Sequence, residues 1–457
     1  MAEFLIILNW SILWYLVILS LGYTIQLAAA IPDIFSRFEE SEIGDINELM
    51  RSHTMQPVTV IIPAYNEENN ILNAVYSVLK STYRDVHIII VNDGSIDSTL
   101  DKLKKIFNLE KVNAVLPKKI PTIGKVRGYY VSNYNIKVTL IDKENSGKSD
   151  SLNVALNACR TPLFITMDAD SILEPEAIAN IIFYMLTHEN TVAVGGAVYI
   201  LNGCKYEDGV IIEKKMSRRP LYALQSCEYM RSFLFSRSGW NAFGGALCYA
   251  GAFTLFDHKA VLDVGGFDQK NIAQDFEIIT HLHEYQREQK NNYTIGYTAS
   301  AVAWTDVPGT LKEYWNQRIN WQKYTLRSLL LHKRMLFNPR YGVIGLYSYP
   351  FYLFGETLGV IVEFAAYAVV LLSWYFGILD TYFAILFVII CWGFVTFLTM
   401  ATALMNFVTY NQYRRLSDLL WLLLIVTTES FGFRQFLVVC RMKATLNYFF
   451  GKLIFWK

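Results

Sequence analysis

Cysteine is scarce in this sequence, and its six cysteines stand far apart. There is no Cys-x-x-Cys pair, and no cysteine has a histidine partner at the spacing of a zinc site. This absence argues against a zinc module or a disulfide framework, so we expect reduced, structural cysteines. An excess of charge is missing too, because 41 basic residues face 40 acidic ones. The formal net charge of +1 argues against nucleic acid as a partner.

An ATPase-type phosphate loop is also missing. The segment Ser146-Gly-Lys-Ser149 is similar to the end of such a loop, but the pattern requires glycine at the position of Asp142. A kinase or ATPase is therefore a weak interpretation. Lys148 remains a candidate contact for a phosphate group, because it lies ahead of an expected helix amino terminus.

Apolar residues, by contrast, are abundant at 53% of the 457 residues. This share is typical of a membrane protein with a soluble part. Residues 4–31 carry no charge and exceed the roughly 20 residues that cross a bilayer. They also lack the basic leader and the short apolar core of a signal peptide. We predict a transmembrane helix at 1–31 and a polar connector at 32–56.

The C-terminal part, residues 331–457, contains more apolar runs. Residues 358–379 and 383–408 are predicted to be two transmembrane helices joined by a short turn. The stretch 343–354 is expected to lie in the membrane interface or to line a cavity, because Pro350 breaks it and Glu356 and Glu363 are close by. The stretch 419–431 is expected to be an interfacial or re-entrant element, because basic residues follow it. The positive-inside rule then predicts a cytosolic tail and a cytosolic middle domain at the plasma (inner) membrane.

Residues 57–330 alternate apolar runs with helical patterns, as a soluble α/β domain does. Strands are predicted at 58–62, 87–91, 162–167 and 192–200, and another one ends in the segment 142–148. Helices are predicted at 69–80, after Ser98 or Thr99, at 152–158 with residues 149–151 as the cap, and after 174–176. This order predicts an α/β sheet whose ligands gather beyond the carboxyl ends of the strands.

Carboxylates stand at several of the expected loops. Asp168 and Asp170 follow a buried strand, and their oxygens suit a divalent cation, although such a pair alone is more often a solvated turn. Asp93 comes before Gly94 at another strand exit, where a plain turn is again the commoner explanation. Asp275 opens a helix and is a candidate general base, but an acid favoured by the helix dipole is the simpler alternative.

The segment 315–321 offers an amide, a guanidinium and two tryptophan rings at the end of the domain. Such Trp and Arg side chains can stack on sugars or hold a diphosphate. An amphipathic helix packed at the membrane face explains the same residues equally well.

Seven short motifs follow one another along the soluble domain: residues 63–68 (PAYNEE), 92–95 (NDGS), 144–148 (ENSGK), 168–170 (DAD), 251–253 (GAF), 274–275 (QD) and 317–321 (QRINW). In this order they resemble the membrane-bound family 2 glycosyltransferases of the GT-A fold. That group contains the poly-N-acetylglucosamine, hyaluronan, chitin and cellulose synthases. The resemblance implies a Rossmann-like GT-A domain at 57–330, joined to transmembrane and interfacial α-helices.

The resemblance also implies roles for the residues that would bind the donor. Asp93 would contact the nucleoside, while Lys148 and Asp168 would contact the nucleotide sugar. Asp168 and Asp170 would hold Mg²⁺ or Mn²⁺ on the diphosphate, where the metal neutralises charge on the leaving group.

Asp275 would be the base that deprotonates the acceptor hydroxyl for an in-line, inverting attack. Gln317, Arg318 and Trp321 would line the acceptor and diphosphate end of the site. All of these roles are implied by the resemblance and wait for a test.

Two positions depart from the family pattern. Gln274 replaces the acidic residue before the base, which leaves the base itself in place. Asn320 replaces the arginine that usually precedes the last tryptophan. This second change removes a bidentate diphosphate contact unless Arg318, Lys323 or Arg327 supplies it, so it bears on rate or processivity.

The expected enzyme is a hexosyltransferase that moves sugar from a nucleotide-diphosphate donor, expected to be UDP-linked, to a growing polysaccharide. It would act processively and export the chain through its own spans, with membrane lipid and accessory export subunits as partners. One alternative is the transfer of a single sugar to a polyprenyl-phosphate or glycolipid. Another is a catalytically silent membrane scaffold, which Asn320 favours.

Overall fold

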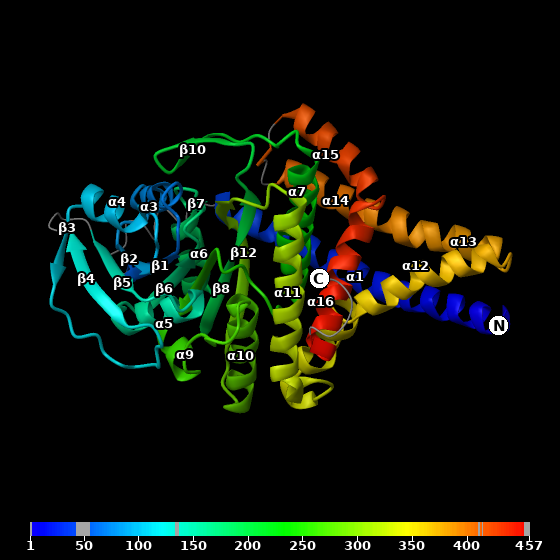
Figure 1. The fold of residues 1–457 in the computed structure, drawn as a ribbon, viewed down its shortest axis with the longest axis horizontal. Coiled ribbons are helices and arrows are strands. Elements are labelled where there is room, and N and C mark those ends of the chain that lie inside the picture. Colours follow the sequence, from blue (N-terminus) through cyan, green and yellow to red (C-terminus); the bar gives the residue numbers. More distant parts are fainter. Residues whose placement is uncertain (1, 43–54, 133–136, 410–411, 414, 452–457) are drawn as a thin grey trace. The chain divides into compact units, whose positions relative to one another are not determined.

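The computed structural model describes residues 2–42, 55–132, 137–409, 412–413 and 415–451 (Figure 1). The chain divides into two compact units. The sheet unit comprises Asp33–Met216 and Gly244–Val307. The helical unit comprises Met1–Pro32, Ser217–Phe243 and Pro308–Lys457.

The sheet unit is built on a ten-stranded mixed sheet with the order β3-β4-β5-β2-β1-β6-β11-β8-β12-β7 (Figure 1). Its strands are β1 (Val58–Ala64), β2 (Val86–Asp93), β3 (Leu109–Val112), β4 (Val126–Ser132), β5 (Val138–Lys143), β6 (Leu163–Met167), β7 (Ser171–Leu173), β8 (Thr191–Ile200), β11 (Phe253–Asp257) and β12 (Thr294–Thr305). A separate antiparallel ribbon pairs β9 (Lys205–Glu207) with β10 (Val210–Glu213).

The centre of the sheet is parallel and apolar. Strands β5, β2, β1 and β6 run in the same direction. Their interior residues are buried, as expected for parallel strands that are covered by helices on both faces. The four carboxyl ends therefore meet at one edge of the sheet. Ala64, Asp93, Lys143 and Met167 end these strands, so the loops that follow them are brought together.

Within the described residues, six helices accompany the sheet. They are α3 (Ile71–Leu79), α4 (Thr99–Ile106), α5 (Lys148–Ala158), α6 (Ala177–Thr187), α9 (His258–Asp263) and α10 (Gln274–Glu288). Helix α5 packs on β1 and β2, α3 packs on β2 and β7, and α6 packs on β8 and β12. Helix α3 packs on the sheet through an apolar face, in which Ile71, Ala74, Val75 and Val78 are all buried.

The helical unit contains the apolar helices of the chain. Its helices are α1 (Ala2–Glu42, of which the unit takes the part up to Pro32), α7 (Pro220–Met230), α8 (Arg237–Ala242), α11 (Leu311–Leu331), α12 (Gly359–Tyr375), α13 (Thr381–Val388), α14 (Val395–Val408), α15 (Leu416–Glu429) and α16 (Phe433–Phe450). Within the described residues, three helical stretches are long and apolar enough to cross a membrane: Ala2–Pro32, Ile344–Tyr375 and Thr381–Val408. The bent pair α15 and α16, with 57° between them, is either a broken span or a re-entrant loop.

Two polar contacts join helices inside the helical unit. Asn9 of α1 donates to Ser373 of α12 at 2.9 Å, next to an apolar contact of Leu5 and Ile12 with the same helix. Arg434 of α16 forms an ion pair with Glu363 of α12 at 2.6 Å. Ionisable groups in apolar helices are costly when they face lipid, so this pairing is what a membrane-associated unit requires.

The predicted strands are confirmed as β1, β2, β5, β6 and β8, and the N-terminal apolar helix is present as α1. Helix α1 continues to Glu42, into the predicted connector, and residues 43–54 lie outside the described residues. The stretch 343–354 is continuous with the next apolar helix instead of being separated from it at Pro350. Helices α7 and α11, which the sequence assigns to the soluble domain, group with the helical unit. The domain boundaries stay a proposal.

One helix start was predicted wrongly, while α6 begins at Ala177, directly after residues 174–176 as expected. Helix α5 begins at Lys148 and not at Leu152, and its N-cap is Gly147 with a φ of +96°, a conformation that other residues rarely adopt. Residues 149–151 are thus buried in its first turn and do not cap it. The aspartate pair leads into the short strand β7 and not directly into a helix, because β12 offers a strand edge for pairing.

Candidate active site

The aspartate pair lies directly beyond β6. The backbone N–H of Ser171 donates to the Asp168 carbonyl at 3.1 Å, so the segment is a tight turn between β6 and β7. Asp170 accepts a hydrogen bond from the Thr305 hydroxyl at 3.1 Å. Burial, followed by the nearby carboxylates of Asp168 and Glu67, raises the pKa of Asp170 to about 7. The turn therefore holds crowded carboxylates and is more than a solvated connection.

Lys148 faces this turn from the first position of α5. Its ammonium forms an ion pair with Asp168. It also donates to the Gln274 side-chain oxygen at 3.1 Å in the amide orientation that lets the Gln274 nitrogen donate to a backbone carbonyl. Burial disfavours the charged amine, but the carboxylates of Asp168, Asp275 and Asp170 outweigh it and raise the pKa of Lys148. A cation is thus fixed among three carboxylates at the start of a helix.

Asp275 lies in the first turn of α10. Its carboxylate accepts from the Gly251 N–H at 3.3 Å and from the Phe276 N–H at 2.9 Å. Burial raises the pKa of Asp275, and the charge of Lys148 partly opposes that shift. A side chain at position 251 would begin 3.4 Å from Lys148 Nζ and 3.4 Å from Asp275 Cβ. Both distances are ordinary van der Waals contacts, so position 251 lies directly against the two groups.

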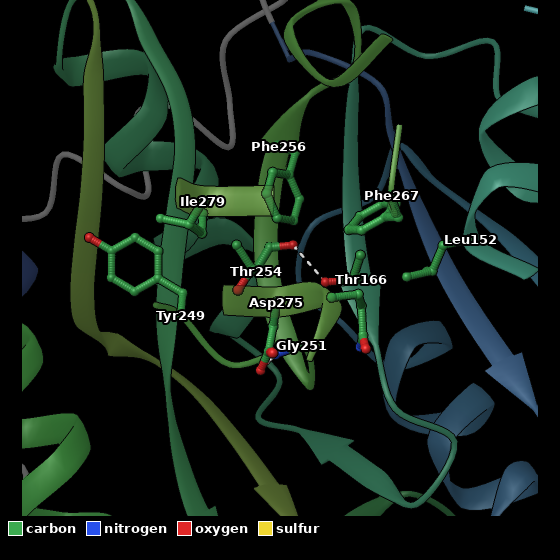
Figure 2. A pocket seen from close by; sticks show the side chains of 10 residues that line it. Leu152, Thr166, Tyr249, Gly251, Thr254, Phe256, Phe267, Asp275 and Ile279 are labelled. Carbon is green, nitrogen blue, oxygen red and sulfur yellow. Dashed lines mark hydrogen bonds between the residues drawn. The ribbon is translucent and has the colours of Figure 1, made fainter. Parts of the chain in front are cut away.

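Asp275 also closes one end of a small pocket (Figure 2). The pocket is lined by Leu152, Thr166, Tyr249, Gly251, Thr254, Phe256, Phe267, Gln274, Asp275 and Ile279. Figure 2 shows Asp275 beside Gly251, and it shows the Thr166 hydroxyl donating to the Thr254 carbonyl, at 3.4 Å. Most of the lining is apolar. The carboxylate therefore lies at the polar end of a largely apolar wall, which accounts for its desolvation.

Asp93 ends β2 and binds the loop that leads to Lys148. Its carboxylate accepts from the N–H groups of Ser146 at 3.0 Å and Gly147 at 2.8 Å, and it forms an ion pair with Lys143. These contacts use one oxygen twice and the other once. Each carboxylate oxygen accepts about two hydrogen bonds, so one acceptor position of Asp93 is not used by these contacts, although only 4% of the residue is exposed.

The remaining predicted residues lie on α11 in the helical unit. Arg318 is buried, pairs with Glu228 of α7 at 2.8 Å, and stacks on the rings of Tyr314 and Trp321 at 4.5 Å and 4.1 Å. Trp321 keeps 44% of its surface exposed. Gln317 Oε1 is buried without a hydrogen-bond partner. These residues form one cluster of their own, so their role at the donor site stays a prediction.

Four of the predicted residues thus share one electrostatic environment, namely Lys148, Asp168, Asp170 and Asp275, while Asp93 is joined to it through the loop 144–148. The sequence interpretation missed Lys143 and Asp150, which face each other at 3.1 Å. The signal for Lys143 was its position at the end of an apolar strand, where a charge is out of place. Within the described residues, no three or more His, Cys, Asp or Glu side chains are grouped as a metal site. The predicted cation site thus consists of two carboxylates, those of Asp168 and Asp170.

Family models match most of this region. The model of "Glycosyl transferase family 2" matches residues 59–229. The model of "Glycosyl transferase family group 2" matches residues 163–428, which is more than half of the chain. The chain belongs to the family 2 glycosyltransferases. This confirms the predicted family and the class of enzyme.

Relatives of this glycosyltransferase include named synthases. Poly-beta-1,6-N-acetyl-D-glucosamine synthase of Staphylococcus aureus (strain MSSA476) is 29% identical over 267 residues, which is 58% of this chain and 54% of the relative. The enzyme of the same name from Staphylococcus epidermidis is 26% identical over 268 residues. The chain thus aligns with about half the length of the relatives that it matches.

A solved structure supports the fold assignment. The mannosyltransferase PcManGT from Pyrobaculum calidifontis, in complex with GDP-Man and Mn²⁺, has a TM-score of 0.54 and 15% identity, and the match covers 95% of this chain and 99% of that one. At this identity the likeness shows the fold. The predicted GT-A fold with associated apolar helices is confirmed.

Proposed function

We propose that this family 2 glycosyltransferase transfers a hexosyl unit, with inversion, from a nucleotide-diphosphate sugar to the hydroxyl of a growing polysaccharide. The observation that carries the proposal is the position of Lys148. Its ammonium pairs with Asp168 of the strand-exit turn and lies close to Asp275 of α10. A phosphate-binding cation and a candidate base therefore share one site at the carboxyl edge of the sheet.

The donor half of the reaction uses Lys148, Asp93 and the aspartate pair. Lys148 binds a diphosphate oxygen as a point charge, and Asp93 receives the nucleoside. Asp168 and Asp170 fit Mg²⁺ or Mn²⁺, because both are hard oxygen donors and because Asp170 is crowded by like charge. When bound, the cation neutralises charge on the leaving nucleoside diphosphate.

The acceptor half of the reaction uses Asp275. A general base needs a carboxylate within hydrogen-bond reach of the attacking hydroxyl, with a pKa closer to the working pH than that of a free aspartate. Two backbone N–H groups hold Asp275 in place, and burial raises its pKa. The acceptor oxygen loses its proton to Asp275 and bonds to the anomeric carbon. The bond from that carbon to the diphosphate breaks on the opposite side, so the configuration inverts.

The α11 cluster supplies the acceptor and diphosphate contacts in this proposal. Trp321 offers an exposed ring on which a sugar can stack. Gln317 has an unpartnered buried oxygen that can accept from a sugar hydroxyl. Arg318 keeps Trp321 in place, because it stacks on that ring while Glu228 neutralises its charge.

The product and the membrane arrangement complete the proposal. The named relatives are poly-beta-1,6-N-acetyl-D-glucosamine synthases, which supports a polysaccharide product. A UDP-linked donor is part of the proposal. The three apolar helices support an integral membrane protein. We place it in the plasma (inner) membrane with a cytosolic sheet unit, and we propose processive elongation with export of the polysaccharide through the spans. Membrane lipid and accessory export subunits are the proposed partners.

A product assay tests this function. Membranes that carry the full chain are incubated with a panel of labelled UDP and GDP sugars in the presence of Mg²⁺ or Mn²⁺, and the products are separated by mass and by lipid extraction. We expect label from a UDP sugar in a high-mass polymer. A lipid-extractable monosaccharide instead would establish single transfer to a polyprenyl-phosphate or glycolipid. No nucleotide release with any donor would refute the proposed function.

A further inference from the structure

Lys143 is a completely buried lysine, with 0% of its surface exposed. It ends β5 and leads into the loop 144–148, which is called the donor loop below because it positions Lys148. Its ammonium pairs with Asp93 and lies 3.1 Å from Asp150 of α5, and it also donates to the Ser146 hydroxyl. A buried ammonium is tolerated only where carboxylates and hydroxyls replace its water, so this position is held by its partners.

Asp150 extends the contact to a second segment. Its oxygens accept from the N–H groups of Ile123 at 2.6 Å and Gly124 at 3.0 Å. They also accept from Gln269 at 3.0 Å and from Ser146. One carboxylate therefore joins the segment before β4, the donor loop and the segment before α10.

Asp93 fixes the other side of the same loop. The two N–H groups that it accepts belong to Ser146 and Gly147, the residues directly before Lys148. A shift of the Asp93 carboxylate would move these peptide groups, and Lys148 with them. Lys143 thus determines where both Asp93 and Lys148 stand, although it has no exposed surface with which to touch a ligand.

Packing at Gly124 shows that the arrangement is tight. A Cβ at this position would lie 2.5 Å from Ser146 Oγ, 2.6 Å from the Glu144 carbonyl oxygen and 2.7 Å from Lys143 Cε. The backbone at 124 therefore lies directly against the donor loop. The loop cannot move toward that side without moving the segment that Asp150 holds.

We propose that Lys143 and Asp150 are positioning residues for the nucleoside diphosphate part of the donor. Together they hold Asp93 and the loop 144–148 in the geometry that binds the nucleoside and the diphosphate. The inference rests on the proposed function, in which Asp93 and Lys148 bind the donor. It adds two residues that act through others, and it predicts an effect on donor binding that exceeds the effect on the chemical step.

The test uses the full chain in detergent and three variants. Ser146→Ala removes the hydroxyl shared by Lys143 and Asp150 and changes no charge. Lys143→Met removes the ammonium. Lys143→Met combined with Asp150→Asn removes both partners but keeps the net charge of the cluster, which limits the risk that the protein fails to fold. Lys137→Met is the matched control, because Lys137 stands at the other end of β5 in an exposed ion pair with Asp85.

Binding of UDP and GDP is measured by titration calorimetry, together with the donor KM, kcat and the melting temperature. We expect the Kd of the bound nucleotide and the donor KM to rise about tenfold or more in both Lys143 variants, and about threefold to tenfold in Ser146→Ala, because charge-assisted hydrogen bonds are lost. We expect kcat to change less than KM in every variant. The control should match the wild type in all four quantities.

Two failures can be told apart. If the wild-type chain binds neither nucleotide and turns over no donor, the proposed function fails, and the positioning role fails with it. If the wild type binds a nucleotide and the folded Ser146→Ala and double variants bind it as tightly, only the positioning role is overturned. A roughly tenfold fall of kcat in the Lys143 variants with an unchanged donor KM would also overturn the positioning role.

Discussion

The ammonium of Lys148 is paired with the carboxylate of Asp168, which lies 20 residues further along the chain. The pair joins the start of α5 to the turn after β6, so it spans the carboxyl ends of two parallel strands. Asp275 of α10 acts on the same ammonium. The donor side and the acceptor side of the proposed site therefore share one charge, and a change at either side is felt at the other.

Replacing Asp275 by asparagine tests the base. The amide keeps the shape of the side chain but cannot take the proton, so kcat should fall about 100-fold to 10,000-fold. Nucleotide binding should change less than kcat, since Asp275 acts on the acceptor and affects the donor only through Lys148. The measurement is the initial rate of nucleotide release from the donor. Asp263→Asn is the control, because that carboxylate lies in an exposed ion pair with Lys259. Normal sugar transfer by Asp275→Asn would refute the mechanism.

The pH dependence tests the environment of the same group. Burial raises the pKa of Asp275, so its base form is lost at a higher pH than in a free aspartate. Activity should fall as the pH is lowered through that pKa, which lies above the ordinary value of about 3.9. Lys148 lowers the pKa of Asp275. In Lys148→Met, the acidic limb of kcat/KM should therefore move to higher pH, and the rate at the optimum should drop.

The profile of kcat/KM against pH, measured for both proteins, checks this expectation. Lys259→Met removes an exposed ammonium of the same kind and should leave the limb in place. A limb that is unchanged in Lys148→Met would mean that Lys148 and Asp275 do not interact in the working enzyme.

Position 251 tests how closely the site is packed. An alanine Cβ would lie 3.1 Å from Gln274 Nε2 and 3.4 Å from Lys148 Nζ. The Gln274 amide must then move by a few tenths of an ångström, while the distance to Lys148 is an ordinary van der Waals contact. Gln274 contacts Lys148, and small displacements of catalytic groups are costly. We expect Gly251→Ala to lower kcat/KM about tenfold, with little loss of melting temperature. Gly393→Ala should have no effect, because no atom lies within 4 Å of the added Cβ.

The strand exits could be predicted from the sequence because they depend on local patterns. An apolar run that ends in a carboxylate identifies β2 and β6, and parallel pairing then gathers Asp93 and Asp168 at one edge. Non-local contacts could not be predicted in this way. Lys143 and Asp150 look like surface charges in the sequence, and only the packing of α5 on β1 and β2 reveals that both are buried.

The start of α5 shows the same limit. Serine and aspartate at 149–151 favour an N-cap by composition. In the structure the N-cap is Gly147, with a φ of +96°, so the helix already begins at Lys148, before residues 149–151. The two N–H groups bound by Asp93 stabilise that start, and Asp93 lies more than 50 residues earlier in the chain. A pattern that covers a few residues contains no information about such a contact.

The ion pair of Arg318 with Glu228 should stabilise the helical unit. In Glu228→Gln the buried guanidinium loses its counter-charge, and breaking such a pair costs roughly 3 kcal/mol when it is buried. Glu228 keeps part of its side chain exposed, so we expect about 2 kcal/mol. Thermal unfolding in detergent measures the loss. Lys205→Met, which breaks an exposed pair, is the control and should cost less than about 1 kcal/mol. Equal melting temperatures would show that the pair adds no stability.

Asn320 offers a gain-of-function test. Arg318 is one of the cations that could replace the missing family arginine, but it is committed to Glu228 and to two aromatic rings. The side chain of Asn320 is exposed on α11. If the cluster meets the diphosphate as proposed, Asn320→Arg adds a planar donor pair suited to phosphate oxygens. We expect kcat/KM for the donor to rise about tenfold, in line with one charge-assisted contact.

The polysaccharide made by Asn320→Arg should also be longer, if release of the growing polysaccharide competes with the addition of the next sugar. Asn320→Lys is the matched variant, because it adds the charge without the fork geometry, and it should give a smaller gain. The assay compares nucleotide release and polymer mass for the three proteins. Should Asn320→Arg leave both unchanged, α11 would not deliver position 320 to the diphosphate, and the acceptor and diphosphate role of Gln317, Arg318 and Trp321 would have to be abandoned.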